Sequence, residues 1–208
     1  MVDGSSHLAD EGHVASDVWR PGDFSCLNEA LDHAARGSHG MTFFDGRGEV
    51  LRELSYRELR ERAVLAARRL IALPGVSRGD RIALIAETRP EFAILFFACE
   101  YAGLVPVPMP ATVSLGGKDF YLRQLRFLIS NSEARAAFAT EEFAGFLRDA
   151  VGDLPLALVG TLEDLDEIAP AATVPPSPVP DENRLRTVHI RQYARSARRA
   201  HHAACGDA

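Results

Sequence analysis

Lysine is almost absent from this chain of 208 residues. Lys118 is the single one, so arginine supplies nearly all of the 23 basic side chains, against 29 acidic residues and a formal net charge of −6. Nucleic acids and anionic membrane surfaces attract basic proteins, so this charge balance argues against either partner. The hydrophobic content of 47% and the charged content of 25% are ordinary for a soluble globular protein.

Cysteines and long apolar runs are also scarce. The three cysteines, Cys26, Cys99 and Cys205, are odd in number and far apart, which predicts no disulfide framework and fits a reducing cytoplasm. The longest apolar stretch, 92–99, is too short to span a bilayer. Residues 1–17 are polar and lack the apolar segment of a signal peptide. We therefore expect a cytoplasmic protein without a membrane span.

Hydrophobic periodicity and turn residues divide the chain into alternating strands and helices. Predicted strands lie at 41–44, 49–54, 81–85, 104–107, 136–139 and 156–159. Predicted helices lie at 27–35, from Ser55 to the Pro74-Gly75 stop, at 91–101, after Gly116-Gly117, and at 141–150.

Local signals support several of these boundaries. Ser25 is the predicted N-cap of the first helix, with Gly37 as its stop, and Ser55 with Glu58 has the spacing of a capping box. Asp45-Gly46-Arg47-Gly48 is typical of a hairpin turn between the first two strands.

The segment from 81 to 107 has the order strand, helix, strand. Such a unit predicts parallel strands and a right-handed crossover, with Gly103 after the helix and Pro106, Pro108 and Pro110 ending the second strand. The helix at 91–101 is apolar on nearly all sides, which predicts burial between layers. The fold class expected is α/β, a doubly wound and mainly parallel sheet with flanking helices.

Three strings in this region are distinctive: L-S-Y-R-E-L at 54–59, R-G-D at 78–80 and A-G-L-V-P-V-P at 102–108. Together they resemble the opening of the adenylate-forming (AMP-binding) superfamily, and most closely the fatty acyl-AMP ligases and acyl-CoA synthetases. The string G-G-K-D-F-Y-L-R-Q-L at 116–125 is more similar to fatty acyl-AMP ligases than to amino-acid-activating domains. The resemblance covers about 27–165, the leading part of a much longer family member.

The resemblance implies two half-reactions. A carboxylate attacks the α-phosphate of ATP, and the acyl group of the resulting acyl-adenylate then passes to a thiol of coenzyme A or of an acyl carrier protein. Family members use Mg²⁺, a phosphate loop similar to S-S-G-S-T-R-x-P-x-G-V and a C-terminal catalytic lysine. The chain contains neither this phosphate-loop string nor the catalytic lysine of the C-terminal domain. No catalytic, cofactor-binding or metal-binding residue is therefore assigned, and the chain alone is expected to bind no cofactor.

The composition changes abruptly from Arg184, after which Asp207 is the only acidic residue. If synonymous codons for 184–199 are read one nucleotide later, they can encode A-Y-V-Q-F-T-S-G-S-T-R-A-P-P-G-V, which is similar to the missing phosphate loop. We therefore hypothesise that the reading frame slipped near Asn183. The domain division expected is a flexible leader at 1–22, a partial AMP-binding α/β domain at 23–168, a Pro-rich linker at 169–183, and an out-of-frame disordered tail at 184–208.

The tail also admits other interpretations. Its arginines could form a nucleic-acid or membrane arm, but they come without lysine or interleaved aromatic residues. His201, His202 and Cys205 could bind a metal, yet their spacing matches no standard ligand set. Both alternatives are disfavoured against a chance cluster in a disordered segment.

Several single residues between 23 and 168 also have two possible interpretations. Cys99, on the most apolar helix, is expected to be buried filler rather than a nucleophile. Lys118 after two glycines lacks the rest of a phosphate-loop pattern, and Asp80 after Arg78-Gly79 is expected to be turn chemistry rather than an adhesion motif. Aromatic residues on the apolar helix could line an acyl pocket, but core packing is favoured: Phe96, Phe97 and Tyr101.

The sequence therefore favours an N-terminal fragment of an ATP-dependent fatty acyl-AMP ligase or acyl-CoA synthetase, truncated by a frameshift and inactive alone. The alternative is a stand-alone α/β module without catalysis that docks on a partner. Uncovered sheet edges and apolar surface would allow self-association in either case.

Overall fold

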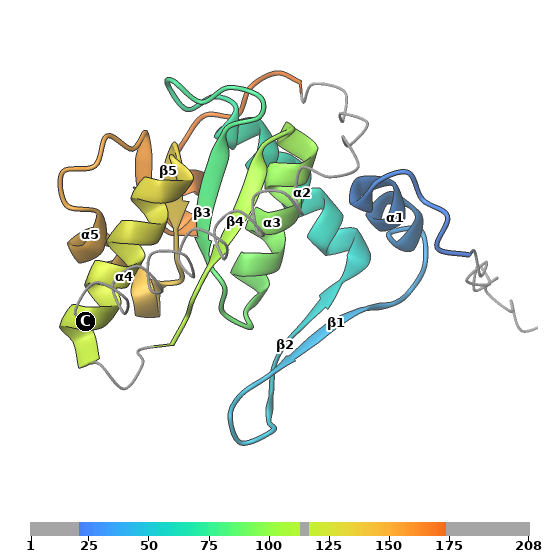
Figure 1. The fold of residues 1–208 in the computed structure, drawn as a ribbon. Coiled ribbons are helices and arrows are strands. Elements are labelled where there is room, and N and C mark those ends of the chain that lie inside the picture. Colours follow the sequence, from blue (N-terminus) through green and yellow to red (C-terminus); the bar gives the residue numbers. More distant parts are fainter. Residues whose placement is uncertain (1–20, 113–116, 174–208) are drawn as a thin grey trace, which may run out of the picture.

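The structure, a computed structural model, describes residues 21–112 and 117–173 (Figure 1). The predicted tail and nearly all of the predicted leader lie outside these residues. The elements in chain order are α1 Leu27–Ala34, β1 Gly40–Phe44, β2 Val50–Ser55, α2 Tyr56–Leu70, β3 Arg81–Ile85, α3 Pro90–Ala102, β4 Val105–Met109, α4 Gly117–Ser132, β5 Ala136–Phe138, α5 Glu141–Val151, β6 Leu158–Gly160 and α6 Leu162–Asp166.

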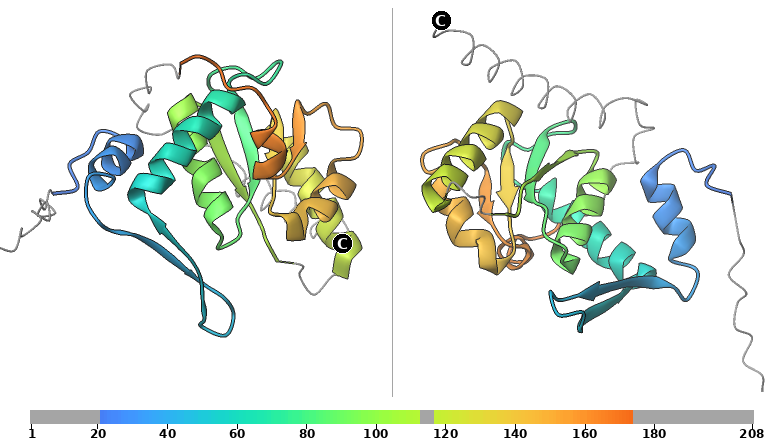
Figure 2. Two further views of the ribbon diagram at one scale, coloured as in Figure 1. Left: turned by 180° about the vertical axis from the view of Figure 1, so that it is seen from behind. Right: turned by 60° about the horizontal axis from the view of Figure 1, so that its bottom comes forward.

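Four strands form one parallel sheet in the order β4-β3-β5-β6. Successive side chains of a strand point to opposite faces, so β3 contributes to two cores. Ile82 and Leu84 pack with α1, α2, α3 and α6, whereas Ala83 and Ile85 pack with α4 and α5. Helices therefore cover both faces of the sheet, as the two views of Figure 2 also show. The predicted doubly wound α/β fold is confirmed.

The β1–β2 hairpin is antiparallel, as predicted, and projects away from the sheet (Figure 1). Its turn is held by the Asp45 carboxylate, which accepts hydrogen bonds from the backbone N–H groups of Arg47 and Glu49, both at 2.8 Å. Gly48 has φ of 85°, a conformation that favours glycine. Near the turn, Phe44 and Val50 are more than half exposed.

Helix α1 begins at Leu27, as predicted, but its N-cap lies one residue later than predicted. Cys26 is its N-cap and makes no side-chain capping bond, so the prediction for Ser25 was wrong. The Glu29 carboxylate instead accepts hydrogen bonds from both the N–H and the hydroxyl of Ser25. The Asp32 carboxylate fixes α1 to its neighbours, because it accepts from Tyr101 Oη at 2.7 Å and from Arg60 Nε at 2.5 Å.

Helix α2 begins at its predicted N-cap, but only one of the two bonds of the predicted capping box forms. Ser55 is the N-cap, and its hydroxyl accepts from the N–H of Glu58 at 3.1 Å. The Glu58 side chain pairs with Arg52 at 2.8 Å. The face of the helix that packs on the core is fully buried at Leu59, Ala63, Ala66 and Leu70.

Two predictions about the βαβ unit need correction. Strand β4 continues through Pro106 and Pro108 to Met109, although these prolines were expected to end it. Val105 N–H donates to the Asp80 carbonyl at 2.8 Å, so 105, 107 and 109 face β3, whereas 106 and 108 face the free edge of the sheet. Proline is tolerated there because it gives up no ladder hydrogen bond. Helix α3, expected to be buried all round, is only partly covered on one half.

Helix α6 was not predicted from the sequence, although its N-cap Thr161 and Asp164 have the spacing of a capping box, and both bonds of that box form. Beyond α6 the chain is fastened to α2. Arg68 Nε donates to the Ala171 carbonyl at 2.6 Å, the Ala171 N–H donates back to the Arg68 carbonyl, and Arg69 Nε donates to Ile168. The first residues of the predicted linker are therefore held on the helical layer. Among the described residues, no helix has both the length and the apolar character needed to cross a membrane.

Candidate functional site

The sheet changes direction between β3 and β5. The chain leaves β3 toward β4 on one side, and it leaves β5 toward β6 on the other. In open α/β sheets, ligands bind outside the carboxyl ends of the strands at such a switch point. The loops after β3 and β5 are therefore the first place to look for a site.

Side chains from these two loops meet across the switch point. Thr140, directly after β5 and α5's N-cap, donates its hydroxyl hydrogen bond to the carboxylate of Glu87, which follows β3. Arg89 and Glu142 form a second, longer ion pair between the loops at 3.8 Å. The contacts tie the two strand ends together and leave few polar groups for a ligand.

A cavity of about 380 Å³ opens at this edge, lined by Arg89, Glu91, Thr140, Glu141, Glu142 and Glu163. Four carboxylates face a single guanidinium, which is itself paired with Glu142. The electrostatic potential of this lining is negative, so it repels phosphate groups. This cavity does not fit a nucleoside triphosphate, and among the described residues no His, Cys, Asp and Glu side chains form a group of three that could hold a metal ion.

Tyr121 supports the same edge from α4. Its hydroxyl donates to the Pro110 carbonyl at 2.8 Å and thereby holds the chain that leaves β4. Burial, together with the negative charge of Glu87, raises the pKa of Tyr121 to about 12. The side chain therefore remains a neutral hydrogen-bond donor at physiological pH.

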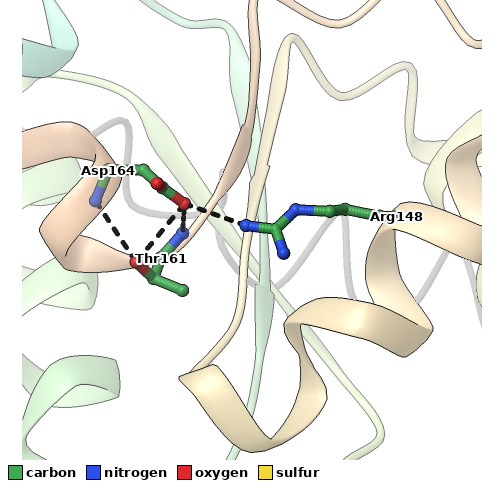
Figure 3. A network of polar contacts seen from close by, with 3 residues as sticks. All are labelled: Arg148, Thr161 and Asp164. Atoms are coloured by element: carbon green, nitrogen blue, oxygen red, sulfur yellow. Dashed lines mark hydrogen bonds and ion pairs between the residues drawn. The ribbon is translucent and has the colours of Figure 1, made fainter.

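A second polar cluster lies at the carboxyl end of β6 (Figure 3). The Asp164 carboxylate accepts from the Thr161 N–H at 2.8 Å and from Arg148 of α5 at 3.2 Å. The carboxylate lies so close to Gly160 that a Cβ there would be 2.3 Å from its Oδ2 atom. This cluster joins α5, β6 and α6, and all of its hydrogen bonds serve packing.

The residues singled out from the sequence do not meet in one site. Cys99 is fully buried, and burial raises the pKa of its thiol well above the usual value, so it is no nucleophile. Lys118 pairs with Asp149 at 3.1 Å near the start of α4, and the Asp80 carboxylate accepts from the Ser77 N–H within its turn. These positions confirm the interpretations as filler, exposed helix start and turn.

The aromatic residues of α3 are divided between two roles. Tyr101 is buried and bonded to Asp32, whereas Phe96 and Phe97 lie on the partly exposed half of the helix and pack against the core from outside. The polar residues at the switch point were missed: Glu87, Arg89, Thr140 and Glu142. Their positions directly after two predicted strands were the signal that could have identified them.

The fold is thus a doubly wound α/β domain whose carboxyl edge supplies no phosphate or metal site among the described residues. The sequence model of the AMP-binding enzyme family matches residues 31–203. The chain belongs to this family, which confirms the resemblance found in the sequence.

Individual relatives show which members of the family the chain is similar to. A Caulobacter vibrioides protein classed as an acyl-CoA synthetase is 41% identical over 150 residues, which cover 72% of this chain and 26% of that protein. The 4-hydroxybenzoate–CoA/benzoate–CoA ligase of Rhodopseudomonas palustris is 36% identical over 135 residues, covering 64% of this chain and 23% of the ligase. The chain therefore spans about a quarter of the length of these relatives.

Solved structures of the same kinds of enzyme are also similar to this chain. A structure from a study of fatty acyl-adenylate ligases of E. coli and L. pneumophila is 37% identical, with a TM-score of 0.70 over 76% of this chain and 28% of that one. A benzoate–CoA ligase of Burkholderia xenovorans is 25% identical, with a TM-score of 0.54 over 71% of this chain and 29% of the ligase.

Proposed function

We propose that this chain is the leading segment of an ATP-dependent ligase that activates a fatty acid as its acyl-adenylate. The observation that carries the proposal is the combined likeness to fatty acyl-adenylate ligases, 37% identity with a TM-score of 0.70, and to an acyl-CoA synthetase at 41% identity. In the complete enzyme, coenzyme A or an acyl carrier protein would accept the acyl group, and ATP and Mg²⁺ would be required. The proposed location is the cytoplasm, in keeping with three separated cysteines.

The electrostatics of the switch point support inactivity of the chain by itself. Adenylate formation develops negative charge on phosphate oxygens, which needs positive charge or aimed N–H donors nearby. The cavity here presents four carboxylates and one paired arginine. The groups that bind ATP would therefore come from the remaining three-quarters of the enzyme.

Pyrophosphate exchange tests both the proposed fatty-acid substrate and the inactivity of the chain by itself. The purified chain, incubated with ATP, Mg²⁺ and fatty acids of graded length, should show no exchange above the no-enzyme blank. The intact Caulobacter relative is assayed in parallel and should show exchange. Exchange catalysed by the chain alone would contradict its inactivity. Failure of the intact relative with every fatty acid, but activity with an aromatic acid, would contradict the proposed substrate class.

We further propose that the reading frame slips near Asn183. Support comes from the phosphate-loop string that codons for 184–199 can spell one nucleotide later, and from the loss of acidic residues at the same point. The family match extends to residue 203 and includes most of this tail, which counts against the slip. The coding DNA is therefore the direct test. The proposal expects the shifted frame to spell S-G-S-T-R and to continue as a ligase; any other DNA sequence refutes it.

The interaction module without catalysis remains the second candidate. The partly exposed apolar side chains of α3 favour a docking role. A monomeric elution profile with cooperative melting would support an independent module, whereas insolubility or concentration-dependent association would support a fragment.

A further inference from the structure

Two adjacent arginines of α2 hold the segment that follows α6. This segment, residues 167–173, contains no helix or strand, and we call it the strap. Arg68 Nε donates to the Ala171 carbonyl at 2.6 Å, and the Ala171 N–H donates back to the Arg68 carbonyl at 3.0 Å. Arg69 Nε donates to the Ile168 carbonyl at 3.1 Å. Both guanidinium groups therefore bind the backbone of the strap.

The strap has few other contacts that could hold it in place. Ile168 packs against the hydrophobic core, and every other strap side chain apart from that of Ala171 is exposed. A hydrogen bond from a charged donor is about twice as strong as one between neutral groups. The position of the strap therefore depends on the two guanidinium groups.

The same two arginines do little for the packing of α2 itself. The helix is anchored on the core by other, fully buried side chains, among them Leu59, Ala63 and Leu70. Among the described residues, the side-chain hydrogen bonds of Arg68 and Arg69 all go to residues 166–171. Loss of the guanidinium groups should therefore release the strap and leave the core of α2 intact.

The strap brings the chain back to the amino ends of the strands. Helix α6 begins at the carboxyl end of β6, and the strap then runs along α2 to Arg68, close to the end of that helix. Figure 1 and the left view of Figure 2 show the strap beside the turn 71–80, which leads into the start of β3. The arginines thus fix the place at the amino edge from which the polypeptide continues.

This place matters because ligands of such sheets bind at the opposite, carboxyl edge. In the complete enzyme, the groups that bind ATP come from the chain beyond the strap and have to reach that edge. A one-residue slip of an extended segment turns each side chain to the other face. An error of about 1 Å in position can lower a rate about 100-fold.

We propose that Arg68 and Arg69 are positioning residues for adenylate formation, which clamp the strap on α2 and so determine where the continuing chain places the ATP-binding groups of the ligase. This inference rests on the proposed function, because it takes the continuing chain to supply those groups. The arginines act through the strap and touch neither substrate nor reacting atoms.

Amide hydrogen exchange in the full chain tests the clamp. Arg68→Gln with Arg69→Gln should speed exchange of the Ala171 N–H by about ten-fold or more and leave the amides of β3 within about two-fold of their original rates. Arg62→Gln is the matched control, because it removes a guanidinium of the same helix that pairs with Glu58 at 3.8 Å. It should leave exchange at Ala171 unchanged.

The kinetics of a complete enzyme test the positioning role. In a chimera, residues 23–173 replace the matching segment of the Caulobacter relative, and pyrophosphate exchange is measured with ATP and fatty acids. The double glutamine variant should raise the KM for ATP by about five-fold or more with no change in the KM for the fatty acid, and Arg68→Lys with Arg69→Lys should restore part of the loss. A merely structural role would reduce the folded fraction, which lowers kcat and leaves the KM for ATP unchanged.

Two results would overturn the proposal: unchanged exchange at Ala171 in the double glutamine variant, or an unchanged KM for ATP. Acceleration of exchange throughout β3 would also overturn it, because the arginines would then support the whole domain. If the chimera does not fold, the same substitutions are made at the aligned positions of the intact relative, where the same rise in KM is expected. An intact relative that exchanges pyrophosphate with no fatty acid would count against the proposed function instead, while exchange at Ala171 still decides whether the clamp exists.

Discussion

Replacing Glu100 with glutamine should stabilise the protein in a pH-dependent manner. Burial raises the pKa of Glu100 in the folded chain from its ordinary 4.5 to about 7. The folded state therefore holds the proton more tightly than the unfolded state. Stability that is fully present below about pH 4.5 is lost as the pH rises through the folded pKa near 7. Glutamine is neutral throughout, so Glu100→Gln removes this loss.

The size of the effect follows from the two pKa values. One pKa unit corresponds to about 1.36 kcal/mol, so full burial would give an upper limit of ~3.4 kcal/mol. Glu100 is only half-buried, and solvent screening reduces the expected gain to ~1–2 kcal/mol at pH 8, with almost none near pH 4.5. For a chain of this length that is a rise of about 2–4 °C in Tm per kcal/mol.

Urea unfolding at several pH values between 4.5 and 8 measures the difference between the variant and the unmodified chain. Glu61→Gln, which removes an exposed carboxylate of α2, controls for the loss of one charge. A stability difference for Glu100→Gln that stays constant across this range would refute the reasoning, because the carboxylate would then be ionised in the folded state at all these pH values.

Two further substitutions probe the polar contacts around the sheet. Gly160→Ala should lower the free energy of unfolding by ~1–3 kcal/mol, because the new Cβ would press on the Asp164 carboxylate, which Thr161 and Arg148 hold in place. Gly145→Ala on α5, where the new Cβ would have open space, should instead raise the free energy of unfolding by about 0.5–1 kcal/mol. A loss of stability at both sites would contradict this account. Tyr121→Phe leaves the Pro110 carbonyl without its donor and should lower the free energy of unfolding by ~1 kcal/mol with no change in m-value, whereas an unchanged midpoint in urea would show that the bond contributes nothing.

The parallel sheet could be predicted because its strands and the helix between them have clear signals in the local sequence. The run 81–85 is apolar and bounded by a turn, and the helix after it begins at Pro90 and ends at Gly103, which has φ of 67°. Each of these signals comes from residues that are neighbours in the sequence, so a single sequence is enough to detect it. The fold class and the parallel pairing therefore followed from the sequence.

The errors came from information that lies outside each element. Whether a proline ends a strand depends on which edge its nitrogen faces, and that is fixed by pairing with β3 rather than by β4 itself. Whether α3 is enclosed depends on which other elements pack around it, and its own apolar pattern does not record that. The pairs at the switch point, Glu87 with Thr140 and Arg89 with Glu142, join residues more than fifty positions apart, so periodicity could not reveal them.

The prolines of β4 also limit how the protein can aggregate. A fibre built by strand pairing grows only if every subunit offers two competent edges, one to bind and one to be bound. In the four-stranded sheet, β4 and β6 are the two outer strands, and Pro106 with Pro108 removes the donors from one of them. Pairing through this sheet can then join two copies at β6 but leaves neither with an edge for a third, so such assembly stops at the dimer.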